Sequence, residues 1–431
     1  MKKRIIPMLL CVCLLLPCIG CNKRIEEQND FPISQLEPET EIPQKDVEIG
    51  NIPRAVTDFS VRLLQTELQY SKGNMNRLLS PFSVLTAMAM VINGAENETK
   101  AQMEEVLGLP VENLNPFISR YMQSLPQEDE NRFCMANSIW FTEDKRFTVE
   151  EEFLNINKEY YGADVYEKPF DQMTVSEMNQ WVEDNTDGLI KEILNEIPAD
   201  AVMYLINALV FDAKWEKTYE ESDIRKDVFT TFDGVKQEID YMFSTENMYL
   251  EDEHATGFIK YYDGGDYAFV ALLPNENMTL LEYIDSLSGE SLYNLLLSAE
   301  EVKTHAWLPQ FEVEYQTELK KTLEVMGMTD VFDGEKADLS ALGSSTSGNL
   351  YVDRVIHKTY MEVSPVGTKA GAATVVEVRD ECAVIEPVEI KEVRLERPFL
   401  YMIIDCSYNQ PIFIGTVNYI KGYRCGVTDE N

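Results

Sequence analysis

The chain has 431 residues, of which 45% are hydrophobic, enough for one large domain or two domains of ordinary size. Its 75 acidic side chains outnumber 37 basic ones and give a formal net charge of −38, so nucleic acid and anionic membrane surfaces would repel it. We therefore expect no nucleic-acid partner and interpret the charge as a well-solvated acidic surface.

Residues 1–20 have the pattern of a secretory signal peptide. Three basic residues at positions 2–4 precede an apolar run at 5–16 that is too short to span a bilayer. The run ends in Cys18-Ile19-Gly20-Cys21, which resembles a bacterial lipoprotein signal, although Cys18 replaces the usual Leu. Diacylglycerol on Cys21 would anchor the mature chain. We expect an extracytoplasmic protein, secreted or lipid-anchored to the bacterial outer membrane or cell surface, with membrane contact only through this lipid.

Residues 21–54 are polar and acidic and contain four prolines, at positions 32, 38, 43 and 53. Such a segment cannot bury enough apolar area to fold, so we interpret it as a tether. The folded domain is expected to cover 55–431. Its cysteines are scattered and, with Cys21, odd in number, which predicts no disulfide framework. The chain has only three histidines, so we expect no metal site and no cofactor.

Helical patterns dominate the first half of this domain. Apolar residues recur at helical spacing from 56 to 68. A short strand then leads to Ser80 and Pro81, which can cap and begin a helix that is apolar on all faces up to Ile92. Because such a helix must be buried, Ser83 within it needs a hydrogen-bond partner. A strand at 136–141, a helix at 153–161 and a helix from 178 that breaks at Gly188 follow.

Strands dominate the second half. The pattern predicts a buried strand at 204–211 with Asn207 as its one polar member, and another strand at 267–274. Further predicted elements are a helix at 280–297, a strand at 308–313, a helix at 319–326, a strand at 355–363, and a hairpin of 398–404 with 411–417. Helices and strands do not alternate strictly, so we predict an α+β fold with large mixed or antiparallel sheets.

Residues 368–378 have an unusual pattern. One alternating set is small or β-branched and uncharged, namely Thr368, Ala370, Ala372, Thr374, Val376 and Val378. The other set is Lys369, Gly371, Ala373, Val375, Glu377 and Arg379. In a strand the first set would face a core, yet the Ala/Gly centre has low strand propensity. We interpret the segment as a loop in one state and a buried central strand in another. An ordinary Ala-rich surface loop is the alternative.

The chain from Val56 to Ile420 resembles the serpin family through a set of short motifs in a shared order. These are Asn76-x-x-x-Ser80-Pro81-x-Ser83, Ala136-Asn137-x-x-Trp140, Asn179-x-Trp181-Val182, Thr186-x-Gly188-x-Ile190, Asn207 through Trp215, Leu273-Pro274-Asn275, Leu308-Pro309-x-Phe311, Leu323-x-x-Met326-Gly327-Met328, Ala337-Asp338-Leu339-Ser340, His357-Lys358-x-x-x-Glu362-Val363, Gly367-Thr368-x-Ala370 and Pro398-Phe399.

The resemblance implies a serpin fold of three β-sheets with eight or nine helices and an exposed reactive-centre loop, here about 367–397. It also implies suicide inhibition of serine proteases by a protein that is not itself an enzyme. The protease cleaves the loop and becomes ester-linked to it, and the N-terminal part of the loop inserts into the central sheet. The hinge of that loop would be Gly367, Thr368, Ala370, Gly371, Ala372, Ala373 and Thr374. The expected state is a monomer.

In the family a polar cluster controls the opening of the sheet, and Ser80, Ser83, Asn207 and His357 match it. Trp215 matches the family's tryptophan at the mouth of the opening. The simpler interpretations are a satisfied core histidine and a large core aromatic residue. The chain departs from the family at Ser364-Pro365-Val366, where acidic residues are usual, and at Lys369, where Glu is common.

Family spacing from Gly367 places the scissile bond at Glu381-Cys382, in a loop about six residues longer than is typical of the family. Glu381 would suit a Glu-specific protease, Arg379 a trypsin-like one, and Val384 or residues 376–378 an elastase-like one. Cys382 is interpreted as a small loop residue, with cross-class inhibition of papain-like cysteine proteases as an alternative. The rival from another class is a non-inhibitory serpin that acts as a surface binding or adhesion protein.

Overall fold

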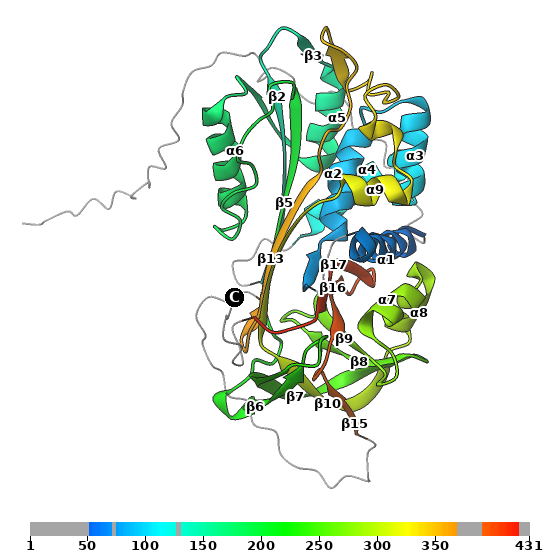
Figure 1. Cartoon of the computed structure of the whole chain (residues 1–431), viewed down its shortest axis with the longest axis vertical. Helices are drawn as coiled ribbons and strands as arrows, with labels where there is room; N and C mark the ends of the chain where they lie inside the picture. The colour runs from blue at the N-terminus through cyan, green and yellow to red at the C-terminus, as the bar shows by residue number, and fades with distance from the viewer. Residues whose placement is uncertain (1–50, 71–74, 126–130, 369–389, 422–431) are drawn as a thin grey trace, which may run out of the picture. The chain divides into compact units, whose positions relative to one another are not determined.

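A computed structural model of the chain describes residues 51–70, 75–125, 131–368 and 390–421 (Figure 1). Within these ranges the α-helices are α1 (Ile52–Tyr70), α2 (Pro81–Ile92), α3 (Asn97–Leu107), α4 (Val111–Ser124), α5 (Glu151–Tyr161), α6 (Gln172–Asn185), α7 (Leu280–Ser286), α8 (Gly289–Leu297) and α9 (Lys320–Met326). The described residues contain no helix that is both long and apolar enough to cross a bilayer.

Three β-sheets contain the strands. They are β1 (Arg77–Leu79), β2 (Asn131–Thr142), β3 (Phe147–Val149), β4 (Asp164–Lys168), β5 (Met203–Lys214), β6 (Ile224–Thr230), β7 (Lys236–Glu251), β8 (Ala255–Tyr261), β9 (Tyr267–Pro274), β10 (Glu300–Pro309), β11 (Phe311–Glu318), β12 (Gly343–Ser345), β13 (Ile356–Val363), β14 (Gly367–Thr368), β15 (Lys391–Arg394), β16 (Phe399–Asp405) and β17 (Gln410–Val417). The nine helices and three sheets of the described residues confirm the predicted α+β serpin fold.

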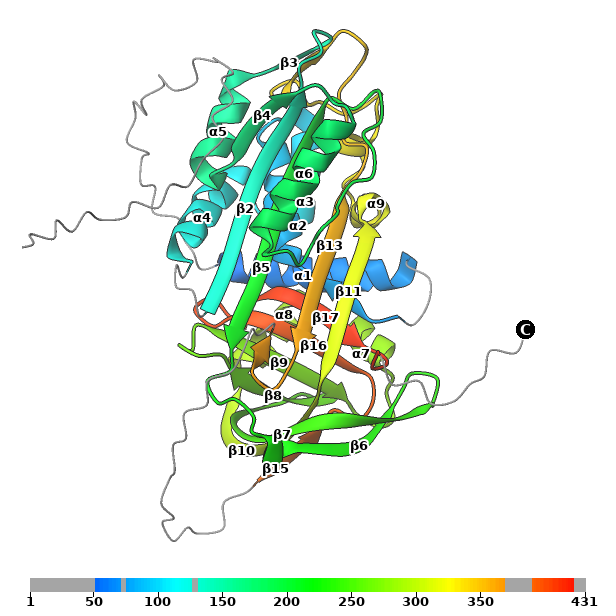
Figure 2. The same cartoon turned by 90° about the vertical axis from the view of Figure 1, so that its left-hand side faces the viewer.

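The six-stranded sheet has the order β11-β13-β14-β5-β2-β4. Helix α6 covers one face of it and α2 lies on the other (Figures 1 and 2). Helix α2 begins at Ser80, whose side chain accepts a hydrogen bond from the Ser83 amide, followed by Pro81 in the first turn. Because α2 is buried on nearly every side, its sequence is apolar all round, as expected.

The nine-stranded sheet has the order β1-β17-β16-β9-β8-β7-β10-β15, with β6 paired to β7. Every residue of β9, β16 and β17 is buried, which explains why their sequences are continuous apolar runs. The predicted hairpin forms from β16 and β17, which pair antiparallel. Parallel pairing of β2 with β4 and of β10 with β15 makes both large sheets mixed.

Three predicted boundaries are wrong. The helix expected at 280–297 is two helices, because Leu287 is extended and Ser288 caps a new helix. The strand expected at 308–313 is the junction of β10 and β11, which belong to different sheets. Strands also occupy both ends of the loop expected at 367–397, because β14 and β15 each pair with a neighbouring strand. Helix α1 begins at Ile52, close to residue 55, where the folded domain was expected to begin.

Candidate functional site

The two-residue strand β14 is wedged between the ends of β13 and β5. Thr368 pairs with Val363 on one side and with Ala213 on the other, and Gly367 pairs with Lys214. Both neighbours run antiparallel to β14, so β13 and β5 run parallel to each other (Figure 2). In the described part of the chain, β13 and β5 are joined in the sheet only through β14. The first two residues of the expected hinge therefore already belong to the central sheet.

A tight turn connects β13 to β14. The backbone and side chain of Ser364 both donate to the carbonyl of Gly367, each at 3.0 Å. Pro365 stands at the second position of this turn, where its fixed φ is favourable. Gly367 is required because a Cβ there would collide with the carbonyl oxygen of Ala213. The departures from the family at 364–366 thus form an ordered hairpin turn.

The segment that follows β5 clamps this turn. The Trp215 amide donates to the Val366 carbonyl at 2.9 Å, and its indole Nε1 donates to the Ser364 carbonyl at 2.9 Å. The Tyr219 amide donates to the Pro365 carbonyl, also at 2.9 Å. Three consecutive carbonyls of the turn are therefore bonded by one neighbouring segment. Trp215 lies at this end of the strands, away from the four residues of the polar cluster.

Tyr262 contacts both Trp215, in the segment at 215–219 that we call the clamp, and Thr368 of the hinge. Its ring stacks on that of Trp215 with centroids 4.5 Å apart and an interplanar angle of 13°. Its hydroxyl lies 2.5 Å from the Thr368 hydroxyl, in a position where both groups are buried. Burial raises the pKa of Tyr262, so its hydroxyl stays protonated and able to donate.

A buried ion pair between Lys260 and Glu246 contacts the segment at 215–219. The Lys260 ammonium donates to Glu246 at 2.9 Å and to the Lys217 carbonyl at 3.2 Å. It also lies 4.5 Å from the ring centroid of Tyr219. The Lys260 side chain is only 2% exposed, so the pair fixes the position of the segment at 215–219.

A cavity of about 500 Å³ lies between β5 and β13. We call it the slot. It is lined by residues 203–209 of β5, by 352–359 leading into and through β13, and by the α2 residues Ser83, Val84 and Met88. The slot is mostly apolar, but it includes Ser80, Ser83, Asn207 and His357 in its lining. The structure thus places all four residues of the predicted polar cluster in one cavity.

Hydrogen bonds through side chains and backbone amides connect these four residues. The Ser80 amide donates to Nε2 of His357 at 3.0 Å, and the Ser80 hydroxyl donates to the Ile412 carbonyl at 3.0 Å. The Ser83 amide donates to the Ser80 hydroxyl, and the Ser83 hydroxyl donates to the side-chain oxygen of Asn207. These hydrogen bonds link β13 to β5 through the start of α2, along the wall of the slot.

His357 is held neutral in this cluster. Its Nε2 accepts a hydrogen bond from Ser80, which requires an unprotonated nitrogen. Burial lowers the pKa of His357 from 6.5 to about 4. Protonation would therefore break the bond to Ser80 and place an uncompensated charge beside the slot.

Asn137 extends the cluster and was not among the predicted site residues. Its side-chain oxygen accepts from Asn207 Nδ2 at 2.8 Å, and its own Nδ2 donates to the Tyr161 carbonyl at 2.8 Å. Asn137 and Asn207 are register partners in β2 and β5. The available signal was a polar residue at 137 within an apolar strand, the same signal that indicated Asn207.

The remaining predicted residues lie outside the described residues. These are Cys21 of the lipidation motif, Ala370, Gly371, Ala372, Ala373 and Thr374 of the hinge, and Arg379, Glu381, Cys382 and Val384 around the candidate scissile bonds. Among the residues that are described, no group of three or more His, Cys, Asp or Glu side chains is arranged to hold a metal ion.

Comparison with known proteins shows the family to which the chain belongs. The family model described as serpin (serine protease inhibitor) matches residues 54–420. This chain is a serpin. It is 30% identical to leukocyte elastase inhibitor A of Mus musculus over 384 residues, which cover 84% of this serpin and 98% of the mouse protein.

Two solved structures show the same architecture. The thermophilic serpin tengpin in its native state is 44% identical, with a TM-score of 0.81 over 88% of this chain and 96% of tengpin. Tengpin in its latent state is 43% identical, with a TM-score of 0.76 over 89% of this chain and all of tengpin. This serpin therefore belongs to a family named for protease inhibition, and structures of its relative tengpin have been solved in a native and a latent state.

Proposed function

We propose that this serpin inhibits serine proteases by suicide cleavage of its reactive-centre loop. The protease serine attacks the scissile carbonyl, an ester forms with the N-terminal part of the loop, and the C-terminal part leaves with a new amine. Residues 369–378 then fill the slot as a continuation of β14. The protease, carried along on the ester, is deformed before water hydrolyses the bond. Inhibition is thus a race between insertion and deacylation.

The observation that carries this proposal is the position of β14 at the head of the slot. Thr368 already pairs with both neighbouring strands and Gly367 with β5, so insertion needs no new nucleus and has only to propagate. Each further residue gains backbone hydrogen bonds worth about 1 kcal/mol net. We call Thr368, Ala370, Ala372, Thr374, Val376 and Val378 the inward set and the residues between them the outward set. Burial of the inward set would stabilise the inserted strand by about 25 cal/mol per Å² of apolar surface.

Continuing the register of β14 supports the same strand. Thr374 would fall between His357 and Asn207, so a hydroxyl would meet the polar cluster. The other residues of the same set, at positions 370, 372, 376 and 378, are apolar. Position 370 would lie between Met361 and Phe211, and positions 372, 376 and 378 would meet the mostly apolar slot. Nothing charged would be buried in the slot, which keeps the cost of insertion low.

The charged residues of the outward set would lie beside residues of opposite charge on the neighbouring segments. In the same register Lys369 would lie between Glu362 of β13 and Asp212 of β5, and Glu377 would lie beside Arg354. Opposite charges on facing strand positions contribute about 0.2–1 kcal/mol per pair. Lys369, which departs from the glutamate common in the family, would therefore fit this chain's own neighbouring strands.

Protease specificity depends on the scissile bond, for which we propose Glu381-Cys382 on the basis of family spacing. Arg379 would instead suit a trypsin-like protease, and Val384 an elastase-like one. The identity with a protein named as an elastase inhibitor supports testing elastase first. Incubation with elastase, trypsin and a Glu-specific protease should give an SDS-stable covalent complex with at least one of them. Clean loop cleavage with full residual protease activity in every case would instead indicate a non-inhibitory serpin.

Mass spectrometry of the released C-terminal fragment identifies the scissile bond directly. A fragment that begins at Cys382 agrees with the proposed bond, whereas one that begins at residue 380 or 385 assigns the inhibitor to a trypsin-like or an elastase-like target.

We also propose that Cys21 carries a lipid anchor and that residues 21–54 act as a tether between the membrane and the serpin domain. The pattern of residues 1–21 supports this. Expression of the full chain in a bacterial host with labelled palmitate should label the protein, and Cys21→Ala should abolish the label. Equal labelling of both would contradict the anchor.

A further inference from the structure

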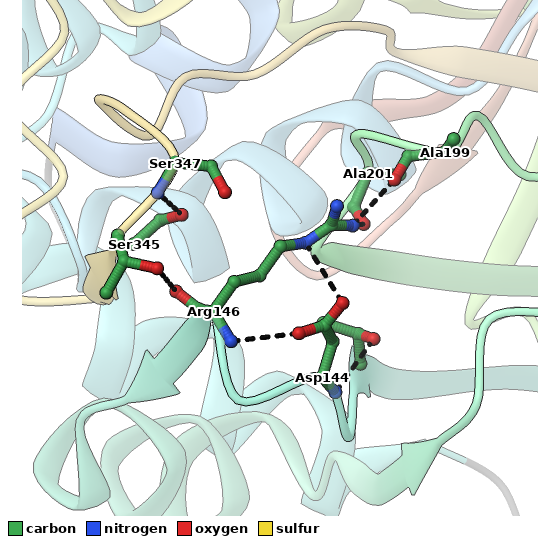
Figure 3. Close-up of polar contacts among 8 residues, drawn as sticks. Asp144, Arg146, Ala199, Ala201, Ser345 and Ser347 are labelled. Carbon is green, nitrogen blue, oxygen red and sulfur yellow. Dashed lines mark hydrogen bonds and ion pairs between the residues drawn. The ribbon is translucent and has the colours of Figure 1, made fainter.

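Arg146 lies where the slot ends, far from β14. It belongs to the loop between β2 and β3, and its guanidinium reaches across to the segment that leads into β5. Nη2 of Arg146 donates to the carbonyl of Ala199 at 2.7 Å and to that of Ala201 at 3.1 Å (Figure 3). Ala201 and Val202 line the slot, so these bonds hold one wall of its far end.

The backbone of Arg146 bonds the chain segment on the other side of the slot. The Arg146 carbonyl accepts a hydrogen bond from the Thr346 amide at 2.8 Å. Next to it, β3 pairs with β12 through Phe147 and Ser345, and the Ser347 amide donates to the Ser345 hydroxyl at 3.1 Å (Figure 3). Ser345 and Ser347 line the slot, and the chain continues from them towards β13. One residue is thus bonded to both chain segments that flank the far end.

Asp144 fixes the direction of the arginine. Its carboxylate accepts from the Arg146 amide at 2.9 Å and lies 3.7 Å from Nε of the guanidinium. Nε itself is buried and makes no hydrogen bond to another described residue. The two carbonyl bonds from Nη2 are therefore the close contacts of the guanidinium. A planar guanidinium can bond two carbonyls from one side, which a flexible ammonium does less well.

We propose that Arg146 is a positioning residue for loop insertion, a strut that sets the separation of β5 and β13 at the far end of the slot. This rests on the proposed inhibitory function. In the continued register Val376 would lie beside Leu205 and Val355, and Val378 beside Met203 and Asp353. The last residues to insert thus arrive next to the segments that Arg146 holds. A strut there acts on the completion of insertion and leaves recognition of the protease unchanged.

The chain offers a matched control in Arg62. Its Nε donates to Asp58 at 2.7 Å and its Nη2 to the Val106 carbonyl at 2.8 Å, so it also joins one carboxylate and a backbone carbonyl. The side chains of Arg62 and Arg146 are 33% and 26% exposed, and Arg62 is not part of the slot lining. Arg62→Ala and Arg146→Ala should therefore lose similar thermal stability.

The test compares the stoichiometry of inhibition, the moles of serpin used per mole of protease trapped, in the full-length protein and these variants. We expect Arg146→Ala to raise the stoichiometry of inhibition about threefold or more, because the variant loses the two charge-assisted hydrogen bonds from Nη2 to the Ala199 and Ala201 carbonyls. We expect Arg62→Ala to leave it unchanged and Arg146→Lys to fall between the wild type and Arg146→Ala. The second-order rate constant for protease association should be the same in all four proteins.

A second measurement needs no protease. A synthetic peptide with the sequence of residues 369–378 is added to the intact protein, and its uptake is followed as the appearance of a form of higher Tm. Arg146→Ala should slow the uptake relative to Arg62→Ala. If the wild type forms trapped complexes or takes up the peptide, and Arg146→Ala matches Arg62→Ala in both assays, the strut is wrong and the inhibitory function stands. If the wild type does neither, the proposed function fails and the strut fails with it.

Discussion

The hydroxyl of Tyr262 lies 2.5 Å from that of Thr368, where a residue of the hinge is already seated in the central sheet. Thr368 is 1% exposed, and its strand neighbours are Val363 and Ala213. The contact connects the stack of Tyr262 on Trp215 to the strand from which the proposed insertion would continue. Under the proposed mechanism, residues that hold β14 in place would affect how the rest of the loop follows.

Tyr262→Phe should loosen β14. The change removes the hydroxyl contact and leaves the buried Thr368 hydroxyl without this partner, at a cost of about 1 kcal/mol. We expect hydrogen exchange in a peptide that covers residues 361–368 to become about fivefold faster. Tyr401→Phe is the control, because Tyr401 is also fully buried and its hydroxyl donates to the Arg77 carbonyl at 3.5 Å, away from the slot. Equal protection of this peptide in both variants would contradict a holding role for Tyr262.

A charge on the inward set should convert the inhibitor into a substrate. Ala372→Arg would have to bury a guanidinium between Thr359 and Leu209 in the continued register, which costs several kcal/mol without a counter-charge. Lys369→Arg places the same guanidinium on the other alternating set, between Glu362 and Asp212. We expect the first variant to be cleaved without forming an SDS-stable complex and the second to keep most of its trapping. Trapping by Ala372→Arg at the wild-type level would show that this position does not enter the sheet.

The sequence predicts the core elements because their residues carry a local signal. The all-apolar helix after Ser80, the apolar strand around Asn207 and the hairpin of β16 with β17 each follow from periodicity and capping. Boundaries set by tertiary contact were not predictable. The change of sheet at Gln310 depends on which neighbours β10 and β11 meet. The break before Gly289, by contrast, follows from the Ser288 cap, a local signal that the interpretation of 280–297 as one helix missed.

The residues of the candidate site also differ in whether the sequence alone indicates them. Ser83, Asn207 and His357 stand out as polar residues in apolar surroundings, and the structure brings them into one cavity. Arg146 carries no such signal, because an arginine in a polar turn is ordinary in sequence. Its importance comes only from the carbonyls it meets, those of Ala199 and Ala201. Likewise, no periodicity places Lys369 opposite Glu362, since that follows from the register of β14.

Lys369→Glu should slow insertion by electrostatic repulsion. In the continued register it would exchange two attractive neighbours, Glu362 and Asp212, for two repulsive ones, each worth about 0.2–1 kcal/mol. We expect the stoichiometry of inhibition to rise about threefold and Glu362→Lys to restore part of it in the double variant. Lys321→Glu, on the surface of α9, controls for the change in net charge. Failure of Glu362→Lys to rescue would contradict this register.

Acid should destabilise the protein through His357. Burial lowers the pKa of His357 from 6.5 to about 4, so between these pH values the unfolded chain binds a proton that the folded protein does not. The contribution of His357 to the free energy of unfolding is fully present above pH 6.5 and falls by about 3 kcal/mol as the pH drops to 4.

Urea unfolding of the wild type and of His357→Gln from pH 8 to 4 measures this contribution. The Gln side chain can accept the Ser80 amide bond but does not titrate. We expect the difference in stability between the two proteins to change with pH below 6.5 and to be constant above it. A difference that is independent of pH would contradict the neutral, buried state of His357.

The central claim is that the intact protein stores free energy that insertion of residues 369–378 into the slot releases. Limited cleavage within the loop, followed by a thermal melt of the cut and the intact protein side by side, tests it without any assumption about the target protease. The cut protein should melt far above the intact one, because its new strand completes the six-stranded sheet. Identical melting temperatures would mean that no strand has been added, and the inhibitory mechanism would be wrong.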